Sequence, residues 1–244
     1  MRKIEGRNPV LEAMNAGREI KKLIIQKGAR GRSIQELIER ADKLNIPVEM
    51  AAKSELDRIA TSSNHQGVVA YADEFRYVHI DEILQFAEDK GESPLIVILD
   101  RIQDPHNLGS IIRTANAAGV HGVIIPKHRA SGITPVVTKT SAGAVEYTKV
   151  ARVTNIARAI DELKEAGLWI VGSGLEGDRS IYQADLKGPL GIVIGSEGEG
   201  MRRLVKEKCD FIVQIPMFGQ IESLNASVAA GIMIYEAVRQ RRFS

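Results

Sequence analysis

The sequence has few of the features that mark secreted, metal-bound or membrane proteins. It contains a single cysteine, Cys209, which excludes an intramolecular disulfide and a cysteine-based zinc site. Its longest apolar runs, such as Leu95–Leu99, fall well short of the ~20 residues that a membrane helix needs. Residues 1–6 lack the apolar stretch of a secretion signal. We therefore expect a cytoplasmic protein with no membrane partner.

Charge and familiar catalytic motifs are also sparse. The formal net charge is only +2, so overall charge gives weak support for a nucleic-acid partner. The five histidines are scattered, and only His106 lies beside a candidate site, so we expect no metal. The Walker A, His-Glu-x-x-His and Gly-x-Ser-x-Gly patterns are missing. The chain does have 244 residues with 44% hydrophobic content, which is enough for a substantial packed core.

The distribution of apolar segments predicts two α/β domains joined by a linker. Residues 1–75 alternate short strands and helices, whereas residues 76–93 are charged and only loosely periodic. In residues 94–244, continuous apolar strands alternate with helices, which is typical of a mostly parallel sheet covered on both faces.

Periodicity and turn residues place the individual elements. The expected strands are residues 19–26, 48–50, 67–72, 95–99, 122–125, 168–171, 190–194 and 211–215. The expected helices are residues 9–15, 33–45, 54–60, 107–118, 155–166, 201–208 and a final helix that runs from 223–225 to about 241. Ser33 and Glu36 form a capping-box pattern. In the final helix we expect one apolar face to pack, made of Leu224, Val228, Ile232, Tyr235 and Val238.

Two polar clusters follow predicted strands in the second domain. The first contains Asn107, which suits a helix start, and Arg113 six residues later. Arg113 is either a surface side chain or a fixed cation that faces a phosphate or carboxylate. The second is the glycine-rich segment 195–200, where the glycines either form a structural turn or let the backbone approach a ligand closely.

The third cluster joins the last predicted strand to the final helix. The strand stops at Pro216, and a polar loop leads to Ser223 and Asn225, two residue types that cap helices well. A strand end, a loop and a helix start that meet at one point are where α/β proteins bind small molecules. By itself, this junction predicts only that a small molecule binds there, and capping remains a structural role for Ser223 and Asn225.

Two further segments have competing interpretations. Gly172–Gly177 matches the Gly-x-Gly-x-x-Gly pattern of dinucleotide-binding folds, with Glu197 about twenty residues later, but the pattern does not open a predicted helix. The basic loop with Lys27, Arg30 and Arg32 is either solvated or binds RNA phosphates.

Together, the three clusters resemble the SpoU/TrmH-type RNA ribose 2′-O-methyltransferases of the SPOUT class. The matching elements are Asn107-x-Gly109-x-x-x-Arg113-x-Ala115, Ile194-Gly-Ser-Glu197-Gly-x-Gly200 and Ile215-Pro followed by Ser223-Leu-Asn225-x-Ser227-x-Ala-x-Gly231. The similarity covers roughly Leu95 to Arg241. The preceding segment resembles the small ribosomal-protein-like substrate-binding domain of the branch that acts on large-subunit ribosomal RNA, most clearly at residues 65–69.

This resemblance implies a mostly parallel sheet whose C-terminal segment is threaded into a trefoil knot, an exception to the near absence of knots in proteins. It implies S-adenosylmethionine as cofactor and a homodimer. By position, the cofactor-binding residues would be Gly195, Ile215, Ser223, Leu224 and Asn225. The catalytic residues would be Arg113, Asn107, Glu197, Ser223 and Asn225. Arginine is an unlikely free base, and its plainer roles are to clamp the RNA phosphate and to stabilise negative charge on oxygen; whether Arg113 itself takes the proton of the hydroxyl is left open.

The function that we expect is methyl transfer from S-adenosylmethionine to a ribose 2′-hydroxyl, in a guanosine of 23S ribosomal RNA. A transfer-RNA 2′-O-methyltransferase is the nearest alternative, and the added N-terminal domain argues against it. A non-catalytic RNA-binding protein of the same fold is disfavoured by the intact motif residues. The nicotinamide dehydrogenase suggested by Gly172–Gly177 is the weakest alternative.

Overall fold

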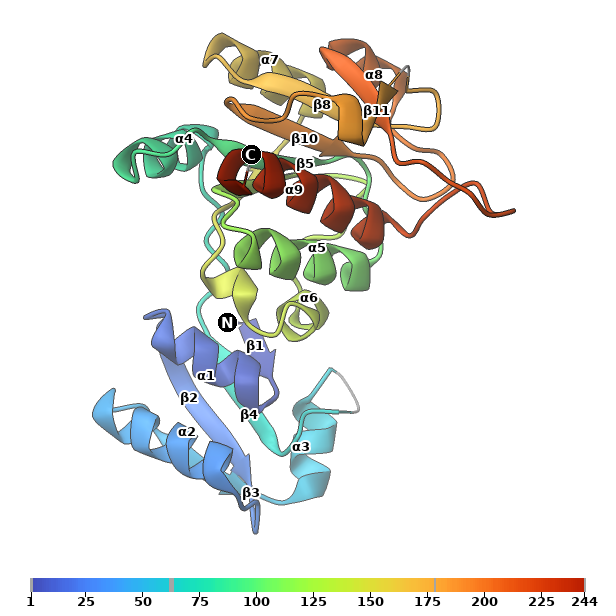
Figure 1. Cartoon of the computed structure of the whole chain (residues 1–244). Coiled ribbons are helices and arrows are strands. Elements are labelled where there is room, and N and C mark those ends of the chain that lie inside the picture. Colours follow the sequence, from blue (N-terminus) through green and yellow to red (C-terminus); the bar gives the residue numbers. More distant parts are fainter. Residues whose placement is uncertain (1, 62–63, 178, 244) are drawn as a thin grey trace. The chain divides into compact units, whose positions relative to one another are not determined.

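The structure is a computed structural model that describes residues 2–61, 64–177 and 179–243. The chain divides into two compact units, each shown in Figure 1. Unit 1 comprises Met1–Arg76 and Ile133–Tyr147, and unit 2 comprises Tyr77–Gly132 and Thr148–Ser244. The first division falls beside the domain end expected at residue 75. Residues 133–147, which sequence order assigns to the second predicted domain, belong instead to unit 1.

Unit 1 is a small mixed sheet with helices on both faces. Its elements are β1 (Arg2–Glu5), α1 (Arg7–Asn15), β2 (Ile20–Gln26), α2 (Arg32–Lys43), β3 (Val48–Ala51), α3 (Lys53–Ile59), β4 (Val68–Ala72), α6 (Pro135–Thr140) and the 3-10 helix η1 (Ala144–Glu146). Among the described residues its strands follow the order β1-β4-β2-β3, with only β2 and β3 parallel. Successive strand residues point to opposite faces, so Leu23 and Ile25 pack under α1 and α2, whereas Ile24 packs with Leu56 of α3.

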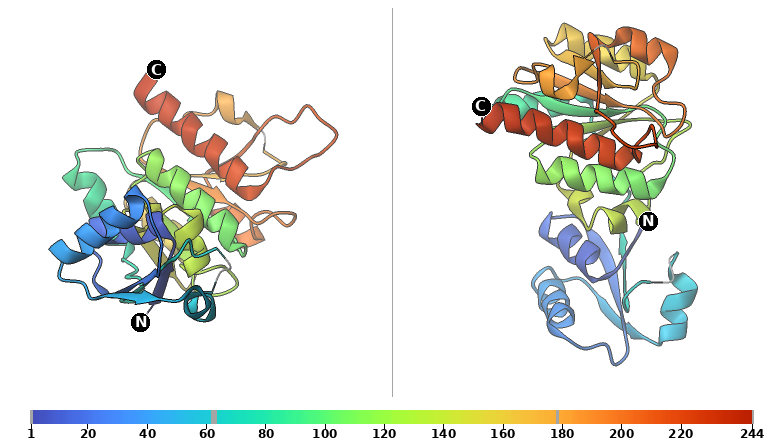
Figure 2. Two further views of the ribbon diagram at one scale, coloured as in Figure 1. Left: turned by 90° about the horizontal axis from the view of Figure 1, so that it is seen from below. Right: turned by 45° about the vertical axis from the view of Figure 1, so that its right-hand side comes forward.

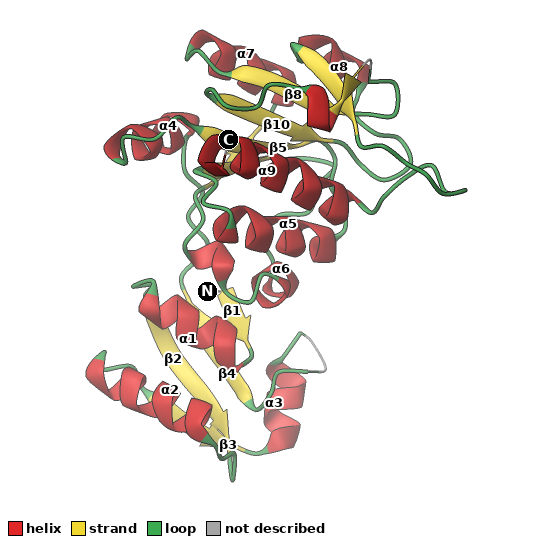
Figure 3. Cartoon of the chain, viewed as in Figure 1, coloured by secondary structure: helices red, strands yellow, loops and turns green. Residues whose placement is uncertain are grey.

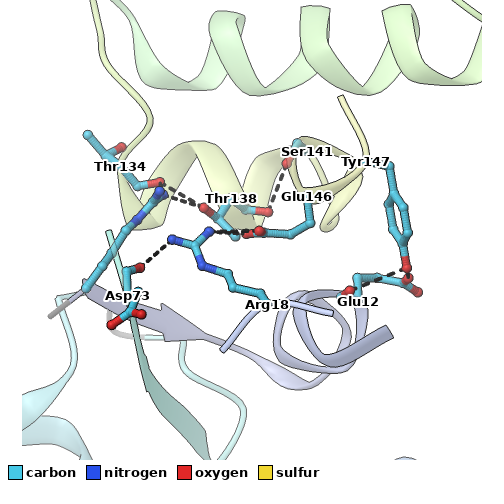
Figure 4. Close-up of polar contacts among 9 residues, drawn as sticks. Glu12, Arg18, Asp73, Thr134, Thr138, Ser141, Glu146 and Tyr147 are labelled. Carbon is cyan, nitrogen blue, oxygen red and sulfur yellow. Dashed lines mark hydrogen bonds and ion pairs between the residues drawn. The ribbon is translucent and has the colours of Figure 1, made fainter. Parts of the chain in front are cut away.

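The 133–147 segment is held in unit 1 by side chains from β1, α1 and the turn before β2 (Figure 4). Arg18 forms an ion pair with Glu146 at 2.7 Å, and the two side chains are only 10% and 4% exposed. Arg2 donates to the carbonyl oxygen of Thr134 at 2.6 Å. Tyr147 donates to a Glu12 carboxylate oxygen at 2.6 Å. Burial and this carboxylate raise the pKa of Tyr147 to about 12.

Unit 2 is a larger sheet covered on both faces. Its elements are α4 (Ile80–Asp89), β5 (Leu95–Leu99), α5 (Pro105–Ala117), β6 (Gly122–Pro126), β7 (Val150–Val153), α7 (Ile156–Glu165), β8 (Trp169–Ser173), β9 (Arg179–Ser180), the 3-10 helix η2 (Ile181–Gln183), β10 (Leu190–Ile194), α8 (Arg203–Lys208), β11 (Phe211–Gln214) and α9 (Ala226–Phe243). Among the described residues, seven parallel strands follow the order β7-β6-β5-β10-β8-β11-β9. The expected α/β architecture with a mostly parallel sheet is confirmed. The threading of the C-terminal segment into a knot stays a prediction.

The two faces of this sheet are covered by different helices (Figure 3). On one face, Ile96 and Ile98 of β5 pack with apolar side chains of α4, α7 and α8. On the other face, α5 and α9 pack against each other, as two further views show (Figure 2). Every residue of β5, β6 and β10 is buried, which is why these strands read as continuous apolar runs.

Helix α9 buries a different face from the one that its sequence predicts. Its deeply buried residues are Ala226, Ala230, Met233, Ile234, Glu236, Ala237 and Gln240. The stripe expected to pack includes Val228 and Tyr235, which are 49% and 50% exposed. The prediction of that apolar face was therefore wrong for this chain alone, because Ala230, Met233, Ile234 and Ala237, and not Val228 and Tyr235, face the unit's own core.

Three local expectations also need correction. Helix α2 begins at Arg32 after Gly31 and has no side-chain cap, so Ser33 and Glu36 form no capping box. Helix α4 lies in the segment expected to be a linker, and its Ile80 and Ile83 are buried in the core of unit 2. Helix α6 lies between the strand expected at residues 122–125 and the helix expected at residues 155–166, where no element was predicted. In the part of the chain that the structure describes, no helix combines the length and the apolar character that membrane crossing requires.

Candidate active site

The site is built at the carboxyl ends of β5, β8, β10 and β11. After β5, Asp100 is fully buried and accepts hydrogen bonds from the backbone N–H and Nε of Arg202, at 2.7 and 2.8 Å. Asp104 then caps α5 by accepting from the His106 N–H at 2.8 Å. Asn107 was expected to start this helix, but it is the third helical residue, and its buried side chain is free to face the site.

The glycine-rich segment 195–200 forms a tight loop after β10. Ser196 and Gly200 exchange two backbone hydrogen bonds at 3.1 and 2.9 Å, which bring the ends of the loop together. A side chain at Gly195 would place its Cβ 2.3 Å from the Gly200 carbonyl carbon, so only glycine fits there. The loop is therefore both a structural turn and a fixed support for the side chain of Glu197 at its tip.

Asn225 caps α9, as expected from its residue type. Its Oδ1 accepts from the backbone N–H of Ser227 at 3.0 Å and of Val228 at 3.3 Å. Ser223 was also expected to cap this helix, but it is exposed, and no hydrogen bond links it to another described residue. The capping function belongs to Asn225 alone.

Glu197 is the centre of a polar cluster that joins the three motifs. Its Oε1 accepts from Asn107 Nδ2 at 3.0 Å, from Asn225 Nδ2 at 2.6 Å and from the Ala226 N–H at 3.1 Å. Asn225 Nδ2 also approaches Asn107 Oδ1 at 2.9 Å. The carboxylate thus lies at the N-terminal end of α9, where the helix dipole stabilises negative charge. Three segments far apart in the sequence hold one fixed anion.

A pocket of about 580 Å³ opens beside this cluster, within the ~300–1,000 Å³ range of small-molecule sites. We call it the strand-end pocket. It is lined by residues of the loops after β8, β10 and β11 and by the start of α9: Ser173, Gly174, Leu175, Glu176, Ile194, Gly195, Ser196, Glu197, Gly198, Glu199, Gly200, Met201, Lys206, Ile215, Met217, Glu222, Ser223, Leu224, Ala226 and Ala229. All of these residues belong to unit 2.

The residues predicted to form the site fall into three groups. Gly195, Ile215, Glu197, Ser223 and Leu224 line the strand-end pocket. Asn107 and Asn225 reach it through their hydrogen bonds to the Glu197 carboxylate. Arg113, by contrast, is exposed on α5, is absent from the pocket wall and forms no ion pair with another described residue.

The predicted RNA-binding residues Lys27, Arg30 and Arg32 lie in unit 1, around the turn between β2 and α2. All three are exposed. Gly28 and Gly31 in this turn have positive φ angles of 79° and 114°, so the chain bends sharply and leaves the basic side chains in solvent.

Sequence reasoning missed the segment 173–176 as part of the pocket, because its glycines were assigned to a dinucleotide motif. In the structure, Gly172–Gly177 runs from β8 towards β9 and opens no helix, so the dinucleotide fold is excluded. Glu176 pairs with Lys206, and the hydrogen bond from this lysine lowers the pKa of the glutamate. The feature that could have revealed this segment is its position, because it directly follows a predicted strand, as the other two pocket loops do.

The charges of the strand-end pocket fit S-adenosylmethionine better than a dinucleotide. Four glutamates and one lysine line it: Glu176, Glu197, Glu199, Glu222 and Lys206. S-adenosylmethionine carries a sulfonium, an ammonium and one carboxylate, a net positive charge that carboxylates attract. The pyrophosphate of a nicotinamide dinucleotide would be repelled. When bound, the cofactor supplies a methyl group activated on sulfur, and the chain's residues hold and orient it.

Comparison with known proteins identifies the family of the chain. Residues 94–235 match the model of the SpoU rRNA Methylase family, and residues 3–78 match the model described as RNA 2′-O ribose methyltransferase substrate binding. The first match alone covers more than half of the chain. The chain therefore belongs to the SpoU methylase family, and the resemblance seen in its motifs is confirmed at the family level.

Individual relatives extend the similarity over the whole chain. YacO of Bacillus subtilis (strain 168), which is named as a TrmH family tRNA/rRNA methyltransferase, is 47% identical over 97% of this chain and 94% of its own. The SpoU methyltransferase AviRb of Streptomyces viridochromogenes, solved with AdoMet, has a TM-score of 0.83 and 30% identity over 98% of this chain and 89% of its own. The TrmH/SpoU tRNA modifying enzyme of A. aeolicus has a TM-score of 0.56 and 32% identity, over 61% of this chain and 76% of its own.

Fold, family and cofactor chemistry together define the activity. The chain is an S-adenosylmethionine-dependent RNA 2′-O-ribose methyltransferase of the SpoU/TrmH family. A ribose hydroxyl is a poor nucleophile, so its alignment with the activated methyl group and the removal of its proton are the tasks left to the protein.

Proposed function

We propose that this enzyme methylates the 2′-hydroxyl of a guanosine in 23S ribosomal RNA, as in the branch of the family that its sequence resembles. The observation that carries the proposal is the presence of unit 1, whose residues 3–78 match a substrate-binding model. A separate RNA-binding unit suits a target embedded in a large, folded RNA. A ribosomal RNA substrate would also agree with the expected cytoplasmic location.

The transfer-RNA alternative is less well supported. The A. aeolicus enzyme, named as tRNA modifying, matches 61% of this chain, whereas AviRb matches 98% of it. The part shared with the transfer-RNA enzyme is large enough for the methyltransferase domain expected at residues 94–244, but too small to include all of an added domain at residues 1–75. The added domain therefore favours a different RNA.

Within unit 1, we assign Lys27, Arg30 and Arg32 to contacts with RNA phosphates. Their exposure leaves them available to a partner, and arginine and lysine on a turn can follow a phosphate backbone without selecting a sequence. Arg7 lies close to this turn, because a Cβ at Gly31 would be 3.8 Å from Arg7 Nη1. Its guanidinium donates to the Gln66 carbonyl oxygen at 3.1 Å, which fixes a further positive charge at the same end of unit 1.

We further propose a homodimer in which Arg113 acts in the partner's site. Val228 and Tyr235 are two turns apart on α9, and each is about half exposed, so they form an apolar stripe that the described residues of the chain leave half uncovered. Arg113 is exposed on α5, and the next residue, Thr114, lies against Gly231 of α9. A second copy that covered this stripe would bury the apolar side chains and could receive Arg113.

The experiment that tests the substrate is a map of ribose 2′-O-methylation in ribosomal and transfer RNA from cells with and without the gene. We expect one guanosine of 23S RNA to lose its methyl group when the gene is deleted. Purified enzyme with S-adenosylmethionine should restore it. Loss of a methyl group from transfer RNA only would replace the ribosomal proposal with the alternative.

Mixed dimers test the assignment of Arg113. Arg113→Ala and Glu197→Ala should each abolish methyl transfer, whereas calorimetry should show nearly intact cofactor binding by Arg113→Ala. If Arg113 acts across the interface, a mixture of the two variants regains one complete site in each mixed dimer. For random pairing of equal amounts, about a quarter of the wild-type activity should return. No recovery, with dimers verified by sedimentation, would assign Arg113 to its own chain's site.

A further inference from the structure

A second pocket of about 350 Å³ lies on the other side of the Glu197 loop. Its wall includes Arg101, Asp104, Ser196, Glu197, Glu199 and Ala226. Four of these residues also line the strand-end pocket: Ser196, Glu197, Glu199 and Ala226. Methyl transfer requires the methyl carbon and the hydroxyl oxygen to lie about 3 Å apart. A nucleotide whose base fills the second pocket would have its ribose near the shared wall.

Arg101 in this second pocket has an unusual backbone conformation. Its φ angle is +64°, in the left-handed region that a side chain such as arginine rarely adopts. The preceding residue, Asp100, is fully buried and bound twice by Arg202, so the surrounding structure enforces the bend. Backbone strain that the surrounding structure maintains is typical of functional sites, where it holds a side chain in position for a ligand.

Not all hydrogen-bond donors of the Arg101 side chain have a partner among the described residues. Its guanidinium forms an ion pair with Glu199, and the two side chains are 23% and 72% exposed. Its Nε is buried and has no hydrogen-bond partner among the described residues. Glu199 is itself anchored, since its backbone N–H donates to the Glu197 carbonyl oxygen at 3.0 Å. The N–H donors of Arg101 and the carboxylate oxygens of Glu199 therefore lie next to each other in the wall of the second pocket.

We propose that the second pocket receives the base of the target nucleotide and that Arg101 and Glu199 recognise guanine. The Watson–Crick edge of guanine presents an acceptor, O6, next to two donors, N1–H and N2–H₂. Arg101 donates to O6, and the Glu199 carboxylate accepts from N1–H and N2–H₂. Adenine presents a donor where guanine has O6 and an acceptor at N1, so the same pair rejects it. This assignment rests on the guanosine target proposed above.

A phosphate fits the second pocket less well. Besides Arg101, its wall carries the carboxylates of Asp104, Glu197 and Glu199, which would repel an anion. The same carboxylates accept hydrogen bonds from the ring and amino N–H groups of a base. The charge of the pocket therefore favours a neutral base with exposed donors.

Synthetic RNA fragments around the mapped guanosine test the recognition of the base. One fragment carries guanosine at the target position, and the other carries inosine, which lacks only the 2-amino group. For the wild type, inosine should lower kcat/KM by about tenfold. In Glu199→Ala, kcat/KM for guanosine should fall by a similar factor, and the guanosine-to-inosine ratio should approach one. Glu199 also lines the strand-end pocket, so both fragments are assayed at saturating S-adenosylmethionine, where a change in cofactor affinity cannot alter the guanosine-to-inosine ratio.

Arg101→Gly gives a second, independent test. Glycine adopts a positive φ angle without strain, so this variant should melt at or above the wild-type temperature. Its kcat/KM for the guanosine fragment should nevertheless fall by about tenfold. A purely structural Arg101 would give no such loss of activity in a stable protein.

Three results would overturn the assignment. One is an unchanged guanosine-to-inosine ratio in Glu199→Ala, and another is full activity in Arg101→Gly. The third is a mapped target that is not a guanosine, which would also end the guanosine part of the proposed function. The map is made in cells without any variant, so it separates that failure from a failure of Arg101 and Glu199 alone.

Discussion

At the scale of single residues, the two ends of the Asn225 amide have different partners. Its oxygen caps α9, and its nitrogen donates to Glu197 and Asn107. The sequence predicts both duties, because asparagine is a favoured cap and the motif places it in the active site. The partners of its nitrogen could not be predicted, since they lie 28 and 118 residues away.

Two substitutions should separate these duties. Asn225→Ala removes the cap and the amide, so it should lower the free energy of unfolding by about 1 kcal/mol and also abolish methyl transfer. Asn225→Ser keeps a capping oxygen but lacks the amide nitrogen, so its stability should return without the activity. Chemical denaturation and methylation assays measure the two effects. Full activity in Asn225→Ser would show that the amide nitrogen is dispensable.

His121 gives unit 2 a dependence on pH. Its ring is buried, and Nδ1 accepts from the Leu95 N–H at 3.0 Å, while Nε2 contacts Glu92. Burial lowers the pKa of His121, although the Glu92 carboxylate opposes the shift. Protonation would put a second hydrogen opposite the Leu95 N–H and break that bond.

Because the folded pKa lies below the unfolded value of about 6.5, stability is complete above pH 6.5. It should decrease as the pH falls below that value, since the unfolded chain binds the proton first. Melting temperatures between pH 7.5 and 5 measure this loss. His121→Asn keeps an acceptor near the position of Nδ1 but does not titrate, so its melting temperature should vary less. Equal pH dependence in both proteins would rule out His121 as the source.

At the scale of elements, the least predictable parts are those whose partners lie far along the chain. Strands β5, β6 and β10 were located from their apolar runs alone, because burial on both faces leaves that pattern. Helix α6 and η1 escaped detection, because their short segments owe their conformation to contacts with β1 and α1. The apolar periodicity of α9 identified the helix but not the face that its own unit covers.

The buried ion pair between Arg18 and Glu146 should control how firmly the 133–147 segment is held. Removal of one partner leaves a buried charge, so Glu146→Ala should lower the free energy of unfolding by about 3 kcal/mol. Arg18→Met combined with Glu146→Leu removes both charges and should recover much of this loss. Denaturant unfolding of unit 1 measures the difference. Additive losses in the double variant would contradict a coupled pair.

At the scale of the whole molecule, we propose that the two units divide RNA binding and methyl transfer between them. Every residue of the strand-end pocket belongs to unit 2, whereas the basic turn belongs to unit 1. The approximate boundary at residue 75 is visible in the sequence as a change to charged, weakly periodic residues. The return of residues 133–147 to unit 1 has no such signature, because its polar contacts join residues more than 120 positions apart.

Removal of unit 1 therefore requires changes to two segments, residues 1–75 and residues 133–147. Deletion of residues 1–75 alone would strip the partners from buried residues of the 133–147 segment, such as Val137 and Val145. Deletion of 1–75 with replacement of 133–147 by a glycine-serine linker should give a protein with nearly normal cofactor affinity. Its methylation of the natural RNA should be severely reduced. Calorimetry and methylation assays test both points, and normal RNA methylation would show that unit 1 is not needed.

The excursion of residues 133–147 also sets an order of events during translation. A domain at the start of a chain is generally free to fold before the rest has been made. Here Arg18 and Tyr147 belong to one unit, so the ribosome must synthesise β5, α5 and β6 before the last piece of unit 1 emerges. The N-terminal unit is begun first but completed only after part of unit 2 exists, so the synthesis of the two units overlaps.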